Sequence, residues 1–187
     1  HPMSRFCVRF MAALLVTLSS CGHAERDSDD GEIYSHLGAD FELTDHRGRP
    51  FRLSEHEGVS LLFFGFTSCP DACPLTMSRL ASLMKDVPVD KVSVLFVSVD
   101  PRRDTPERLA QYGASYDFRF IGLTSKDPSR IPPIARAFAA GLQRTSEGTI
   151  DHSSRIYLLD SQHRVRDVFA SDDDTAHMAE VIGSVID

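Results

Sequence analysis

The chain has 187 residues, 42% of them hydrophobic, and a formal net charge of −7 at pH 7. This length and composition suit one compact domain behind a leader segment. An acidic chain without a basic stripe argues against a nucleic-acid partner.

The first twenty residues have the layout of a secretory leader. Two arginines precede the apolar run 10–18, and Ser19 and Ser20 then lead into Cys21. The apolar run is far shorter than the roughly 20 residues that span a bilayer. We therefore predict export rather than a transmembrane helix.

The residues around Cys21 resemble a bacterial lipoprotein box. On this reading residues 1–20 are a lipoprotein signal peptide, and Cys21 carries lipid that holds the mature protein on a bacterial membrane, facing the periplasm or the exterior. The alternative is an ordinary signal peptide cleaved near Ala24. Residues 21–36 are polar and predict a solvated tether, so the folded domain is expected at 37–187.

The domain begins with a predicted β-hairpin. Segments 41–45 and 49–53 alternate in polarity around a connection that contains Gly48. Two near-continuous apolar runs follow at 59–66 and 92–99, as expected for strands buried on both faces.

Between the two apolar runs, residues 74–85 carry apolar side chains at helical spacing. A strand, a helix and a strand in that order predict a right-handed crossover. The remaining predicted elements are a helix at 107–116, a strand near Phe120, a helix at 134–140, a hairpin of 155–160 with 165–169, and a helix from Asp174 to about Ile186.

This order of elements predicts a thioredoxin-like α/β fold, a three-layer sandwich with an N-terminal β-hairpin. A flavodoxin-like fold shares the alternation of strands and helices. It does not usually end in an antiparallel pair, so it ranks second.

Four cysteines lie at positions 7, 21, 69 and 73. Cys7 would leave with the leader and Cys21 would carry lipid, so the domain keeps Cys69 and Cys73. A disulfide across so small a loop would stabilise the domain by about 2 kcal/mol. A domain with this much apolar sequence does not need that bond, so we interpret the pair as chemically active.

The predicted position of the pair suits thiolate chemistry. Pro74 is expected at the first helical position, which places Cys73 at the helix entrance and Cys69 in the preceding loop. The positive end of a helix stabilises the anionic sulfur that both metal binding and disulfide exchange require. Three residues separate the cysteines, where the dithiol oxidoreductases of this fold have two. The longer spacing leaves room for a ligand between the sulfurs.

A histidine is the predicted third member of the site. Thioredoxin-fold reductases place a cis-proline ahead of a late strand, but residues 141–160 contain no proline and His152 lies in that region. We therefore expect His152 to point at Cys69 and Cys73. Two thiolates and an imidazole favour Cu(I), with zinc carrying a water ligand as the alternative. The remaining histidines of the mature chain are expected on the surface or in structural roles: His23, His36, His46, His56, His163 and His177.

Three aspartates near the predicted site are not expected to be ligands. Asp100 follows a buried strand, where an Asx-type turn accounts for it. Asp71 is interpreted as a solvated loop charge, and Asp151 as a group that orients His152.

Three motifs together carry a family resemblance. They are FGFTSCPDACP at 64–74, VSVDP at 97–101 with DTP at 104–106, and DHS at 151–153 followed by YLLD at 157–160. In this order they resemble the SCO/SenC family, over a stretch from about Leu37 to the C-terminus.

The resemblance implies a metallochaperone rather than an enzyme. It implies one copper ion per chain, held by Cys69, Cys73 and His152 and delivered to the dinuclear copper centre of cytochrome c oxidase during assembly. The implied partners are the copper-bearing oxidase subunit, other copper carriers or thiol reductants, and the membrane through a lipid anchor. An extracytoplasmic thiol–disulfide oxidoreductase and a copper or redox sensor remain alternatives. A peroxidase is disfavoured, because we find no Thr/Arg setting for a single reactive cysteine.

Overall fold

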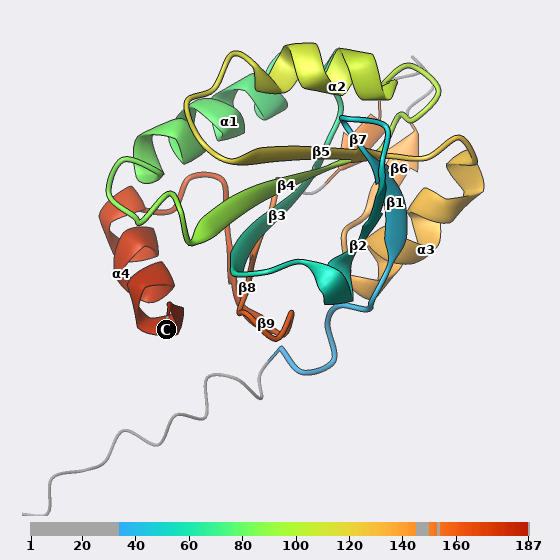
Figure 1. Cartoon of the computed structure of the whole chain (residues 1–187). Helices are drawn as coiled ribbons and strands as arrows, with labels where there is room; N and C mark the ends of the chain where they lie inside the picture. The colour runs from blue at the N-terminus through green and yellow to red at the C-terminus, as the bar shows by residue number, and fades with distance from the viewer. Residues whose placement is uncertain (1–33, 145–149, 153, 187) are drawn as a thin grey trace, which may run out of the picture.

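The computed structural model describes residues 34–144, 150–152 and 154–186, with side chains left undescribed from 143 to 153 (Figure 1). The predicted signal peptide, Cys21 and most of the predicted tether lie outside this part. No helix within the described residues has the length and apolar character that crossing a membrane requires.

A seven-stranded mixed sheet forms the centre of the domain, with strand order β2-β1-β5-β4-β3-β8-β9. The two apolar runs form β3 (Val59–Gly65) and β4 (Val92–Ser98), which pair in parallel and are buried throughout. This burial agrees with their continuous apolar sequence. The next strand, β5 (Phe120–Thr124), lies parallel to β4.

Antiparallel hairpins complete both sides of the sheet. The predicted N-terminal hairpin is present, and its first strand pairs with β5; β3 pairs with the first strand of the C-terminal hairpin. The hairpin strands are β1 (Glu42–Asp45), β2 (Pro50–Arg52), β8 (Ile156–Leu159) and β9 (Val165–Phe169). The β8–β9 turn therefore lies at the amino ends of the parallel strands, opposite the edge from which the helical connections leave.

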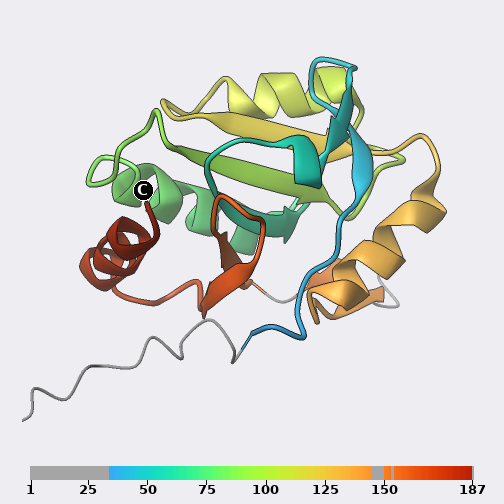
Figure 2. The ribbon, with the colours of Figure 1, turned by 60° about the horizontal axis from the view of Figure 1, so that its bottom comes forward.

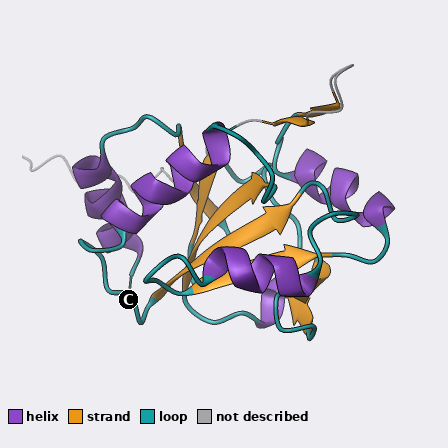
Figure 3. Ribbon diagram, turned by 90° about the horizontal axis from the view of Figure 1, so that it is seen from above, coloured by secondary structure: helices purple, strands orange, loops and turns teal. Residues whose placement is uncertain are grey.

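Within the described residues, four α-helices surround the sheet: α1 (Ala72–Leu83), α2 (Pro106–Gly113), α3 (Ile131–Ala137) and α4 (Thr175–Val185). The 3₁₀ turns η2 (Leu53–Glu55) and η3 (Pro128–Arg130) lie between elements of this part. The helices α1 and α2 lie over the same face of the sheet, as two right-handed crossovers in one direction require (Figures 1 and 3).

Two long-range hydrogen bonds connect helices to the first and last segments of the domain. The Arg79 guanidinium of α1 donates to the carbonyl of Asp173, just ahead of α4, at 2.6 Å. The segment that leads into β1 runs past α3, where the amide of Gly38 donates to the carbonyl of Ala137 at 2.8 Å (Figure 2). Both contacts join segments that lie far apart in the sequence.

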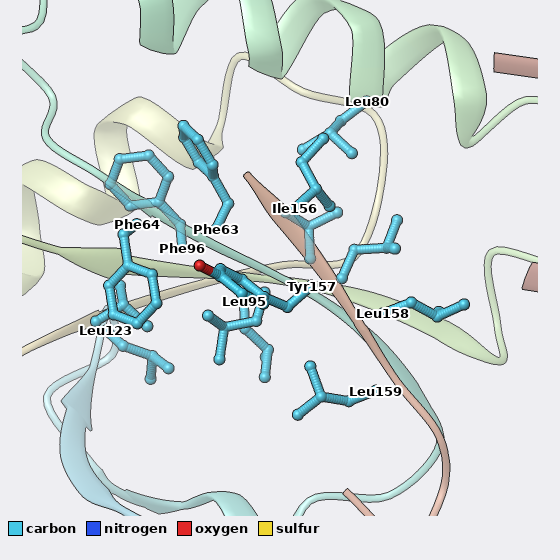
Figure 4. Close-up of a cluster of buried hydrophobic side chains, with 14 of the residues drawn as sticks. Phe63, Phe64, Leu80, Leu95, Phe96, Leu123, Ile156, Tyr157, Leu158 and Leu159 are labelled. Carbon is cyan, nitrogen blue, oxygen red and sulfur yellow. The ribbon is translucent and has the colours of Figure 1, made fainter. Parts of the chain in front are cut away.

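Aromatic side chains fill the core on both faces of the sheet. Toward α2, the rings of Phe96 and Tyr112 lie 5.4 Å apart. Around Phe138, just past α3, the rings of Phe64 and Tyr157 lie 5.8 Å and 5.4 Å away. Figure 4 shows Phe64 and Tyr157 in this cluster, packed among aliphatic side chains of the central strands. The predicted α/β thioredoxin-like order is confirmed.

Three boundaries and one hairpin differ from the sequence prediction. Helix α1 begins at Ala72 rather than at residue 74, α2 ends at Gly113 rather than 116, and α3 begins at Ile131. Proline is tolerated in a first helical turn because the amides there have no intrahelical acceptor. A small second sheet of β6 (Leu142–Arg144) and β7 (Ile150–His152) was not predicted, since three-residue strands carry too little periodicity.

Candidate metal centre

The two cysteines lie where β3 leaves the sheet. After Gly65 the chain turns, and the amide of Cys69 donates to the carbonyl of Phe66 at 3.2 Å. Cys69 is half-buried and carries a free thiol. The loop is therefore a short turn that presents one sulfur at the carboxyl edge of the parallel strands.

Cys73 lies inside the first turn of α1, not at the helix entrance as predicted. It is fully buried, and it is not joined to Cys69 by a disulfide. Its amide donates to Sγ of Cys69 at 3.4 Å. The helix has no side-chain cap at Asp71, so the sulfur of Cys69 accepts from an amide that would otherwise have no intrahelical acceptor. This hydrogen bond fixes one cysteine against the backbone of the other.

Burial raises the pKa of the Cys73 thiol far above its ordinary value. A hydrogen bond to the Phe66 backbone lowers that pKa, but neighbouring Cys69 and the Asp104 carboxylate add to the increase. The metal-free Cys73 is therefore a neutral thiol near pH 7. Because thiolates are the metal-binding form, a metal ion must displace this proton when it binds.

The structure brings the backbone of His152 to the same edge. His152 in β7 pairs with Leu142 in β6. Leu142 lines a cavity of about 200 Å³ together with Asp100 and Pro101, which follow β4. Since β3 and β4 are parallel neighbours, the loops after both strands share one edge of the sheet. The hairpin that carries His152 thus lies at the edge that holds the cysteines.

The donor atoms fit a soft metal ion. Among residues with described side chains, no three potential ligands gather into a cluster. The two sulfurs form a pair, and the side chain of His152 lies outside the described part of the structure. Two thiols with a hairpin beside them suit a copper ion better than a four-ligand structural zinc site.

A buried carboxylate beside the loop was missed by sequence reasoning. Asp104 has no exposed surface, and its Oδ2 accepts from the amide of Thr67 at 3.0 Å and from the hydroxyl of Ser98 at 2.7 Å. Its Oδ1 accepts from the Thr67 hydroxyl at 2.6 Å. The signal in the sequence was an aspartate in DTP ahead of a helix, which resembles an ordinary helix start.

Tyr112 of α2 is a second neighbour that the sequence did not single out. Burial raises the pKa of its hydroxyl, and the neighbouring Tyr116, Cys73 and Cys69 add to the increase. The hydroxyl therefore lies within electrostatic reach of both sulfurs. In the sequence it was one of several apolar-face residues of a helix, with nothing to distinguish it from core.

The aspartates judged not to be ligands are placed as follows. The backbone carbonyl of Asp100 accepts from the amides of Arg103 and Asp104, each at 3.0 Å; these are backbone bonds of a turn and not the side-chain bonds of the predicted Asx-type turn. Asp71 is exposed at the start of α1. The side chain of Asp151 lies outside the described part.

Two of the remaining histidines have structural roles, as predicted. Nδ1 of His46 accepts from the amide of Gly122 at 3.2 Å, and Nε2 of His163 donates to the carbonyl of His56 at 2.7 Å. Both contacts lie away from the cysteine edge of the sheet.

Known proteins are similar to this chain in sequence and in fold. The family model described as SCO1/SenC matches residues 30–187. An SCO2-like protein of Rickettsia conorii is 33% identical over 155 residues, covering 78% of this chain and 75% of that protein. An SCO2-like protein of Rickettsia prowazekii is 35% identical over 114 residues, covering 57% of this chain and 55% of that protein. The match thus spans little more than half of the latter.

Among solved structures, ScoI from Bradyrhizobium japonicum with copper bound superposes with a TM-score of 0.70. It is 31% identical, and the match covers 80% of this chain and 99% of that one. The family model, the relatives and the shared fold agree with the three sequence motifs. The chain belongs to the SCO1/SenC family.

Proposed function

We propose that this protein binds one copper ion through Cys69, Cys73 and His152. It then passes the ion to the dinuclear copper centre of cytochrome c oxidase while that enzyme is assembled. Copper is the cargo in this proposal, and the copper-bearing oxidase subunit is the recipient.

One observation carries the proposal: the two reduced cysteines lie side by side, with the Cys73 amide donating to Cys69 Sγ at 3.4 Å, at the edge that also holds the backbone of His152. A soft donor set of this kind favours copper. The copper-bound ScoI structure, with the same fold, supports the same reading.

Unequal exposure of the two sulfurs suits acceptance and release. Cys69 is half-buried and can receive an ion from solvent, whereas Cys73 is fully buried. Binding displaces the proton of Cys73, so copper affinity falls as the pH falls. Ligands of the recipient reach the ion from the exposed side and replace the donors one at a time.

The same proposal includes attachment to a membrane. Cys21 carries lipid at the start of the mature chain and holds the copper domain at the bacterial membrane surface, facing the periplasm or exterior. The Cys21→Ser variant should leave the membrane fraction or remain unprocessed. Unchanged membrane association in that variant would remove the lipid from the proposal.

The direct test is a copper titration of the reduced, purified mature chain against a competing Cu(I) chelator. The wild-type protein should bind one copper per chain. Cys69→Ser and Cys73→Ser should each weaken Cu(I) binding by at least a hundredfold, because a single thiol leaves a poor soft site. Cys21→Ser, which leaves both site thiols in place, is the matched control and should bind normally. Wild-type affinity in either site variant would place the metal elsewhere.

A second candidate function is thiol–disulfide exchange, favoured by the same unequal exposure. A half-exposed Cys69 suits attack on a partner disulfide, and a buried Cys73 suits resolution of the mixed disulfide. A chain that binds no copper but reduces a model disulfide such as insulin at a catalytic rate would make this the primary function.

A further inference from the structure

The DTP motif at 104–106 has no part in the copper site proposed above, yet its aspartate is the most deeply buried carboxylate near the cysteines. Asp104 lies in the connection between β4 and α2 and has no exposed surface. A buried carboxylate is costly unless hydrogen bonds and a cation compensate for lost water. Its partners therefore show what it holds in place.

Those partners come from three different elements. The amide and the hydroxyl of Thr67 both donate to Asp104, at 3.0 and 2.6 Å, and the Ser98 hydroxyl at the end of β4 donates at 2.7 Å. Nε of Arg108 in α2 lies 3.8 Å from Oδ1 of Asp104 and donates to the Thr67 hydroxyl at 2.7 Å. Thr67 thus makes three hydrogen bonds in this network. Its amide and its hydroxyl both donate to Asp104, and its hydroxyl oxygen accepts from Arg108.

Thr67 lies two residues before Cys69, at the root of the cysteine loop. The carbonyl of Phe66, the residue before it, accepts from the amide of Cys69. Because Thr67 lies between these two residues, hydrogen bonds that hold Thr67 also limit where the Cys69 backbone and its sulfur can lie. We propose that Asp104 is a positioning residue for the Cys69–Cys73 pair, acting through Thr67 to hold the loop in the open, two-thiol geometry that accepts a metal ion.

In this structure the Asp104–Thr67 network is present together with the reduced form of the Cys69–Cys73 pair. The two cysteines are not joined by a disulfide while Thr67 is anchored, and the Cys73 amide donates a hydrogen bond to the Cys69 sulfur. Formation of a disulfide requires the two sulfurs to approach to about 2.05 Å. The anchor resists that approach, so it favours the dithiol and slows the loss of a bound ion.

The test compares Thr67→Val with Thr67→Ser. Valine keeps the branched shape and the backbone amide but removes the hydroxyl that joins Asp104 and Arg108, whereas serine keeps the hydroxyl. Asp104→Asn changes the carboxylate itself. Asp160→Asn is the matched control, because Asp160 is also a buried carboxylate with an arginine four residues on, and it lies in the β8–β9 turn.

Two readouts separate positioning from general stability. The first is the equilibrium of the Cys69–Cys73 dithiol with oxidised dithiothreitol, which needs no copper. Thr67→Val and Asp104→Asn should shift it about tenfold toward the disulfide, as expected for loss of a charge-assisted hydrogen bond. Thr67→Ser and Asp160→Asn should stay within twofold of the wild type.

The second readout is the rate at which a Cu(I) chelator removes copper, and this arm rests on the proposed copper function. Thr67→Val should release copper about tenfold faster than Thr67→Ser. Wild-type values for Thr67→Val in both readouts, or equal shifts in Asp160→Asn, would overturn the inference. A wild-type chain that binds no copper would instead overturn the proposed function, and the dithiothreitol equilibrium would still decide the role of Asp104.

Discussion

The spacing Asp-x-x-x-Arg is used in two ways in this domain, in the hairpin turns and at the cysteine edge of the sheet. In the two antiparallel hairpins, Asp45 and Asp160 each close a turn. Each carboxylate accepts from the amides two and four residues on and from the guanidinium of its own arginine, Arg49 or Arg164, at 2.8–3.0 Å. All of these contacts are local, so each aspartate stabilises only its own turn.

At the cysteine edge, Arg108 follows Asp104 at the same spacing. Nε of Arg108 lies 3.8 Å from Oδ1 of Asp104, however, and it donates its hydrogen bond to the hydroxyl of Thr67. The carboxylate instead accepts from Thr67 and Ser98, and Thr67 lies 37 residues away in the sequence. The same sequence spacing thus closes local turns in the two hairpins and joins distant segments at the cysteine edge. The hairpin aspartates serve stability, and the cysteine edge holds the proposed chemistry.

The largest expected effect is on copper, and it belongs to the cysteine edge alone. Oxidation of Cys69 and Cys73 to a disulfide should abolish stoichiometric copper binding, because a disulfide sulfur offers no thiolate. Copper content after gel filtration of the oxidised and reduced chains measures this. Asp45→Asn, a change in the β1–β2 hairpin turn, should leave reduced-state binding intact. Stoichiometric copper in the oxidised chain would contradict the assignment of copper binding to the cysteine edge.

A smaller effect is expected from Asp160→Ala at the amino edge. Removal of the carboxylate leaves the amides of Gln162 and Arg164 without their acceptor, which should cost about 2 kcal/mol of unfolding free energy. Urea unfolding of the reduced chain measures the loss. Copper affinity should stay at the wild-type value, and a parallel loss of affinity would show that the edges are coupled.

The smallest effect concerns His56, which lies just before β3 at the amino edge. Burial, together with the nearby Arg119 and His163, lowers its pKa to about 4. As the pH falls below the unfolded value near 6.5, the unfolded chain takes up a proton that the folded chain refuses until about pH 4. Stability is therefore lost over that window.

Because His56 is partly exposed, we expect a loss of about 1 kcal/mol between pH 7.5 and pH 5. His56→Gln should remove this part of the pH dependence in urea unfolding. Identical pH dependence in the variant and the wild type would contradict the assignment.

The sequence predicted most of the fold because its central strands are continuous apolar runs and its turns carry clear signals. Thr105 and Asp174, for example, cap α2 and α4 with their side chains. It predicted the cysteine pair, but it could not see that Cys73 enters the helix or that the Cys69 sulfur accepts from its amide. Those facts depend on backbone geometry that proline position alone does not fix.

The sequence also gave no means to separate Asp104 from Asp45 and Asp160. The three share one spacing, and the partners that distinguish Asp104 lie 6 and 37 residues away. Long-range hydrogen bonds leave no periodic signal in a single chain. The hairpin that carries His152 was missed for a related reason, since its strands are three residues long.

The most direct test of the copper-delivery proposal is His152→Ala, which leaves both cysteines and the Asp104 network unchanged. A thiol reductase needs only its two thiols, whereas a copper donor needs the imidazole to retain the ion until the recipient's ligands replace it. In cells that lack the wild-type protein and grow on limiting copper, this variant should fail to restore cytochrome oxidase activity. Its purified dithiol should still reduce a model disulfide at the wild-type rate. Full oxidase activity in those cells would contradict copper delivery through His152.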